Sequence, residues 1–93
     1  MSKVRVLWPK HVQDKILSYQ SEHFTDEETH QFIISWILQV DNLLLNPVLS
    51  KTYTEEYGTY TGVSRIVVNK FKVYYERHDD DIVILAVIFP GEE

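Results

Sequence analysis

Residues 79–90 read DDDIVILAVIFP, and this stretch decides the fold. Three aspartates precede eight residues, Ile82 to Phe89, that carry no polar side chain. Side chains alternate across a β-strand, so a sheet with one solvated face shows apolar and polar residues in turn. Here both faces are apolar. Strict alternation predicts Ile82, Ile84, Ala86 and Ile88 on one face, and Val83, Leu85, Val87 and Phe89 on the other.

Both faces of this strand need cover, and a chain of 93 residues has material for one modest core. The first face is expected to pack beneath Trp36, Ile37 and Val40 of a helix. Leaving the four side chains of the second face in water would forgo roughly 6–12 kcal/mol, which is comparable with the stability of a whole small domain. The sequence therefore predicts a binding face that a partner completes.

Composition indicates a single globular domain over residues 1–93, with 44% hydrophobic and 25% charged residues. The chain has no cysteine, which excludes disulfides, thiolate metal sites and cysteine nucleophiles. The first residues lack the apolar core of a signal peptide, and no apolar run is long enough to span a bilayer. We therefore expect a cytoplasmic protein without a membrane partner.

Charge is distributed unevenly along the chain, whose net charge is −5. Residues 51–78 hold five basic and three acidic groups, whereas residues 79–93 hold five acidic groups and no basic one. Affinity for a nucleic-acid backbone depends on Lys and Arg that displace counterions, so the overall charge argues against non-specific binding to a polyanion. A polyanion site, if present, is expected in the middle segment.

Two amphipathic helices are expected after a short N-terminal strand at Lys3 to Leu7. The first begins at Pro9 and reaches about Glu22, with Val12, Ile16 and Tyr19 on one stripe. The second begins at Thr25, where Glu28 completes a capping-box pattern, and ends at Asn46-Pro47. Their short connection predicts an antiparallel helical hairpin.

The rest of the chain predicts β-structure. Ser64 to Val68 and Phe71 to Arg77 form a hairpin around Asn69-Lys70, whose turn type stays open. The last strand runs from Ile82 to Phe89, and Lys51 to Tyr57 is either a further strand or an extended arm. The order β-α-α-β-β-β predicts an α+β fold, with the helical hairpin packed on one face of a mostly antiparallel twisted sheet.

Several features of this order resemble the RelE/ParE superfamily of bacterial type II toxin–antitoxin toxins. The resemblance rests on order and spacing over nearly the whole chain, in the segments LLLNP (43–47) and SRIVVNKFKVYYERHDDDIVILAVIF (64–89). The matching residues are Val6, Trp8, Asn46-Pro47, Arg65 with Ile66 and Val67, Tyr74-Tyr75, and Ile82 to Val87. The resemblance implies an antitoxin, encoded nearby, whose extended segment covers the open sheet face in a hetero-complex.

Two activities occur in that superfamily. ParE-like members inhibit DNA gyrase by binding it and need no catalytic group, and this is the function we expect. RelE-like members cleave mRNA on the ribosome with basic residues, which Arg65, Lys72 and Arg77 would supply here. The tail FPGEE, however, ends in Glu92 and Glu93 where those nucleases carry basic residues and a catalytic aromatic or histidine. A diverged, non-toxic interaction domain is the third alternative.

The residues predicted to bind the partner are Arg65, Lys72, Tyr74, Val83, Leu85, Val87 and Phe89. Each has a simpler explanation that the sequence leaves open. Arg65 is equally a solvated strand residue paired with Glu76, and the lysines decorate an exposed strand edge. No metal or cofactor site is expected, because the four histidines share no ligand spacing and the three glycines form no nucleotide fingerprint.

Overall fold

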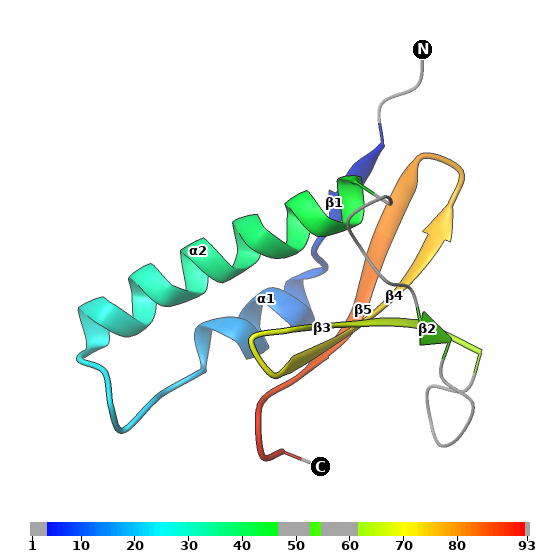
Figure 1. Ribbon diagram of the computed structural model, residues 1–93. Helices are drawn as coiled ribbons and strands as arrows, with labels where there is room; N and C mark the ends of the chain where they lie inside the picture. Colours follow the sequence, from blue (N-terminus) through cyan, green and yellow to red (C-terminus); the bar gives the residue numbers. More distant parts are fainter. Residues whose placement is uncertain (1–3, 47–52, 55–61, 93) are drawn as a thin grey trace.

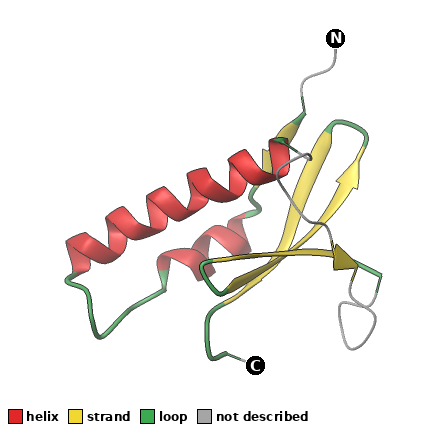
Figure 2. Cartoon of the chain, viewed as in Figure 1, coloured by secondary structure: helices red, strands yellow, loops and turns green. Residues whose placement is uncertain are grey.

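The computed structural model describes residues 4–46, 53–54 and 62–92. The elements are β1 (Arg5–Leu7), α1 (Lys10–Leu17), α2 (Asp26–Leu45), β2 (Tyr53–Thr54), β3 (Ser64–Val68), β4 (Phe71–His78) and β5 (Asp81–Ile88). The strands form one sheet in the order β1-β5-β4-β3-β2, and both helices lie on the same side of it (Figures 1 and 2).

This arrangement is the predicted α+β fold. The strands β2 to β5 pair antiparallel in chain order, and β1 pairs parallel with β5, so that Val6 lies opposite Ile82. Only Tyr53–Thr54 of the segment expected at Lys51 to Tyr57 is described, and these two residues form β2. The described part of the chain contains no helix with the length and hydropathy that a bilayer crossing requires.

Helix α2 begins and ends as predicted. The Thr25 hydroxyl accepts from the Glu28 N–H, and the Glu28 carboxylate accepts from the Thr25 N–H at 2.9 Å, so the capping box is complete. These hydrogen bonds hold the pKa of Glu28 below its usual range. The inward stripe Ile33, Trp36 and Val40 is buried, and Asn46 caps the other end.

Helix α1 is shorter than predicted, because it ends at Leu17 instead of continuing to about Glu22. The Ser18 hydroxyl donates to the Lys15 carbonyl, and the N–H of Tyr19 donates to the Ile16 carbonyl, so the last turn tightens and closes. Tyr19 then leaves the helix, and its ring meets Phe71 and Phe89 at centroid distances of 5.0 and 5.1 Å. Aromatic packing thus determines the end of this helix.

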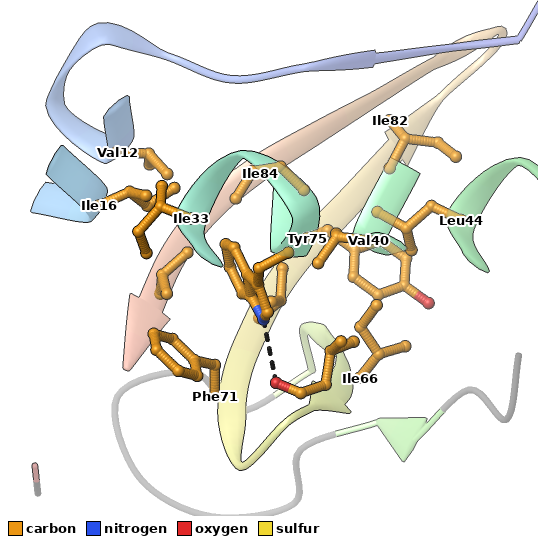
Figure 3. Close-up of a cluster of buried hydrophobic side chains, with 14 residues drawn as sticks. Val12, Ile16, Ile33, Val40, Leu44, Ile66, Phe71, Tyr75, Ile82 and Ile84 are labelled. Carbon is orange, nitrogen blue, oxygen red and sulfur yellow. Dashed lines mark hydrogen bonds between the residues drawn. The ribbon is translucent and has the colours of Figure 1, made fainter. Parts of the chain in front are cut away.

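The core lies between the helices and the sheet (Figure 3). Its largest member is Trp36, which is almost fully buried and whose indole N–H donates to the Val68 carbonyl at 3.0 Å. Trp8 packs against Trp36 edge-on at 6.0 Å and donates its own indole N–H to the Asp41 carboxylate at 2.9 Å. Both buried tryptophan donors are therefore satisfied.

A β-bulge divides strand β5. Tyr75 pairs with Ile84 and Tyr74 with Ala86, which leaves Leu85 without a partner on β4. The extra residue reverses the alternation, so Val87 pairs with the core residue Val73 and is itself buried. The predicted strict alternation is therefore correct from Ile82 to Ile84 and wrong beyond Leu85.

The β3–β4 hairpin closes through Asn69 and Lys70, with φ angles of 52° and 70°. Positive φ at both central residues is the requirement of a type I′ turn, whose twist matches that of the flanking strands. Asn tolerates this region, but the Cβ of lysine makes it costly. The flanking strands thus impose a type I′ turn, which the sequence had left open, although Lys70 is unfavourable in that turn.

We expect Lys70→Gly to raise the free energy of unfolding by about 0.5–1 kcal/mol, because glycine removes the Cβ strain while adding entropy to the unfolded chain. Urea unfolding followed by circular dichroism measures the change. Lys70→Ala is the matched control, since it removes the side chain but keeps the Cβ. Equal stabilities for the two variants would contradict the explanation.

Candidate partner-binding face

The register defines which side chains lie on the sheet face opposite the helices, here called the open face. Residues paired across a ladder point to the same side. Since Phe71, Val73 and Tyr75 belong to the core cluster, the residues between them in β4 belong to the open face together with their partners. By the same alternation, the set comprises Arg5, Leu7, Arg65, Val67, Lys72, Tyr74, Glu76, His78, Asp81, Val83, Ala86 and Ile88.

The centre of the open face is apolar. Val83, Ala86 and Ile88 of β5 are half-buried, and Val67 of β3 is 55% exposed. Within residues 4–46, 53–54 and 62–92, no helix lies over them, because α1 and α2 both pack on the other side (Figure 1). Among the described residues, this apolar centre therefore has no helix packed on it, which makes the face a candidate binding surface.

Two cations flank a tyrosine near the β3 side of this face. Arg65 lies directly opposite Tyr74, and Lys72 lies opposite Val67. Tyr74 is only 6% exposed although it points away from the core cluster. Each of the three has an interaction through its polar groups or ring. The pairing of Arg65 with Glu76, which the sequence left open, is not the observed register.

An ion pair and a histidine–carboxylate contact occupy the opposite end of the open face. Arg5 Nε lies 2.6 Å from the Asp81 carboxylate, and His78 Nε2 lies 3.1 Å from the Glu76 carboxylate. The hydrogen bond from Arg5 holds the pKa of Asp81 below its usual range. The open face therefore carries Arg65 and Lys72 near β3, apolar side chains at its centre, and the contacts Arg5–Asp81 and His78–Glu76 near the β4–β5 turn.

The structure divides the residues that the sequence assigned to partner binding. Arg65, Lys72, Tyr74 and Val83 lie together on the open face. Val87 is buried in the core, and Phe89 packs against the core cluster, so their assignment to the open face is wrong. The bulge at Leu85 is the physical reason, because it moves every later residue of β5 to the other face.

Leu85 itself lies at the bulge, beside α1. It is half-buried and lines an open groove of about 330 Å³ together with His11 and Lys15. Its carbonyl oxygen is 3.3 Å from His11 Nε2. Leu85 therefore contributes to the groove between α1 and the free edge of β5.

Among the apolar members of the open face, the sequence prediction did not include Leu7, Val67, Ala86 and Ile88. The position of Val67 could have been predicted from the sequence, because a two-residue turn at Asn69-Lys70 places Val67 opposite Lys72. The positions of Ala86 and Ile88 could not be predicted, since the sheet face on which they lie depends on the bulge.

The residues expected for an endonuclease are only partly brought together. Arg65 and Lys72 share the open face, but Arg77 pairs with the core residue Ile82, and its Nε donates to the Asp79 carbonyl at 3.0 Å. Among the described residues, no three metal-binding side chains cluster. Arg65 and Lys72 are thus the two expected endonuclease residues that lie on one face, at the β3 side of its apolar centre.

The C-terminal segment folds back onto α1. Phe89 to Glu92 form a turn, with Gly91 at φ 81° and a hydrogen bond of 3.0 Å from the Glu92 N–H to the Phe89 carbonyl. The Glu92 carboxylate accepts from Lys15 Nζ at 2.7 Å and from the Phe89 N–H at 3.0 Å. This carboxylate is therefore held on the helical side of the sheet by Lys15, and Glu93 lies outside the described residues.

Comparison with protein-family models, with curated proteins and with solved structures finds no match to this chain.

The turn at Glu92 should respond to pH. The hydrogen bond from Lys15, and then that from the Phe89 N–H, hold the pKa of Glu92 below its usual range. A lowered pKa means that the contribution to stability is present above the unfolded-state pKa and is lost as pH falls through the folded-state value. We expect the Phe89 amide to exchange faster in that acidic window, as measured by NMR. In Glu92→Gln the exchange rate, corrected for intrinsic chemistry, should not follow this titration.

Proposed function

We propose that this chain is the toxin of a bacterial type II toxin–antitoxin module of the RelE/ParE superfamily, and that it acts in the cytoplasm by binding its target. An antitoxin neutralises it by covering the open face. The proposed target is DNA gyrase, and the proposed mode of action needs no catalytic residue.

One observation carries this proposal: the open face is apolar at its centre, and no described helix packs on it. The fold order and the resemblance in residues 64–89 add the class of partner. The superfamily's antitoxins present an extended segment, which is able to place apolar side chains over Val67, Val83 and Ile88. An acidic side chain of the same segment would meet Arg65 and Lys72, since buried apolar contact gives affinity and charge complementarity gives register.

A binding function fits the polar groups better than a nuclease function does. Cleavage at an RNA phosphate requires cations that converge on the scissile group and a residue that activates the 2′-hydroxyl. Arg77 lies apart from Arg65 and Lys72, and the carboxylate of the C-terminal Glu92 is engaged with Lys15. Arg65 beside Tyr74 is the one arrangement that favours the RelE-like alternative.

We expect Val67→Glu to weaken antitoxin binding at least tenfold, because it places a carboxylate in the apolar centre of the covered surface. The partner is the protein encoded beside this gene, and titration calorimetry with the purified pair measures its affinity. Leu38→Glu is the matched control, since Leu38 is as exposed as Val67 but lies on α2. If both variants lost affinity for the antitoxin equally, or if neither lost it, the proposal that the antitoxin covers the open face would be contradicted.

Two reactions separate the proposed target from its alternative. Purified chain should inhibit supercoiling by gyrase and leave mRNA intact in a translation extract. Arg65→Ala should reduce growth arrest on expression while keeping the unfolding temperature of the parent, and Lys10→Ala on α1 serves as the control. Position-specific mRNA cleavage that Arg65→Ala abolishes would replace the gyrase assignment with the ribosome-dependent endonuclease.

A further inference from the structure

The helical layer carries a second apolar surface, away from the open face. It consists of Leu17 on α1 and of Ile34, Ile37, Leu38 and Leu45 on α2, and is called here the outer helical patch. Ile34, Leu38 and Leu45 follow at i, i+4 and i+11, so they form one stripe beside the buried one. Leu17 and Leu38 are the most exposed, at 66% and 60%.

A groove runs along the patch. It has a volume of about 270 Å³ and is lined by Trp8, Gln13, Ile16, Leu17 and Ile37. The ridge Ile34–Leu38 lies next to this groove, because both residues flank Ile37 along the helix. A ridge and a groove of similar chemistry therefore lie side by side on one surface.

The part of the patch that lies on α2 is poor in charge. From His30 to Asn46, α2 contains a single Asp, Glu, Lys or Arg, which is Asp41. The Asp41 carboxylate accepts from the Trp8 indole N–H and is half-buried. A helix face that meets only water normally carries charged residues, whereas charge depletion around apolar side chains is the composition of an interface centre.

We infer that the outer helical patch is a twofold interface at which two copies of this chain pack α2 against α2 in antiparallel orientation. Near a twofold axis each residue meets its own copy, so any charge there would face a charge of the same sign. A charge-poor face suits this arrangement, and the carboxylate of Asp41, the one Asp, Glu, Lys or Arg between His30 and Asn46, is engaged by the Trp8 indole. The antiparallel direction also separates the acidic first turns, Asp26 to Glu28, of the two copies.

The size of the surface suits the same occupant. The exposed parts of the four outward aliphatic side chains amount to an apolar centre of roughly 300–400 Å² per copy, within the range of large functional patches. Helix α2 has 20 residues and is therefore about 30 Å long. A stable interface buries roughly 800 Å² per partner, so this apolar centre would supply about half of it and the flanking parts of the two helices the rest.

Sedimentation velocity of the purified full chain tests this inference, which does not depend on the proposed toxin function. We expect a species of twice the 11.0 kDa chain mass at concentrations of about 10–100 µM. Leu38→Glu should raise the dissociation constant at least tenfold, because two carboxylates would be brought together near the axis. Leu45→Glu, nearer the helix end, should act in the same direction.

Val67→Glu is the matched control, since it makes the same change at a similarly exposed aliphatic residue on the open face. It should leave the dissociation constant unchanged, and thermal unfolding verifies that every variant is folded. A parent chain that remains monomeric up to about 100 µM would overturn the inference. So would a dimer that Val67→Glu disrupts and Leu38→Glu does not.

Discussion

The unpaired residue Leu85 is the constraint on which the arrangement of the sheet depends. Strand β5 is apolar on both sides, so its side chains alone do not decide which of them meets the helices. Ile84 and Val87 are three positions apart and would lie on opposite faces of a regular strand. The bulge places both side chains in the same core. It costs one position of the β4–β5 ladder, which is worth about 0.5–1.5 kcal/mol. Strict alternation would place Ala86 and Ile88 against the core, so the bulge exchanges these two for the larger pair Val87 and Phe89 and buries more apolar surface.

Phe89 shows how far this constraint reaches. Its ring lies against those of Tyr19 and Phe71, and Lys15 Nζ lies 5.2 Å from its centroid. Tyr19 reaches that position only because α1 ends at Leu17, and Lys15 in turn holds Glu92. The position of Phe89, just after β5, therefore accounts for three features together. These are the end of α1, the packing of the rings of Tyr19, Phe71 and Phe89, and the C-terminal turn.

The parts of the fold that the sequence predicted correctly depend on local chemistry. Thr25 and Glu28 specify the start of α2, and Asn69-Lys70 specifies a two-residue hairpin, within a few neighbouring residues. The bulge has no such signal, because Leu85 and its neighbours are all apolar and no glycine marks the extra residue. The end of α1 was missed for a related reason, since Tyr19 continues the helical stripe in sequence and leaves it only to meet two rings from distant strands. Of the candidate site, the hairpin residues Arg65, Lys72 and Tyr74 were predictable, whereas the face of each residue after Leu85 was not.

The two apolar surfaces are physically independent, because α1, α2 and the core lie between the outer helical patch and the open face. The segment Arg5–Trp8 is the one stretch that contributes to both, with Arg5 on the open face and Trp8 in the helical groove. Trp8 is held by Asp41 and by the edge of Trp36, which keeps this segment in place whichever surface is covered. The acidic first turn of α2 and the residues Asp79, Asp80 and Glu92 lie outside both surfaces, whereas Glu76 and Asp81 lie on the open face beside His78 and Arg5. The net charge of −5 keeps the whole molecule anionic and thus opposes non-specific association. The part of the chain that the structure describes thus carries two separate apolar surfaces, one on each side of the core.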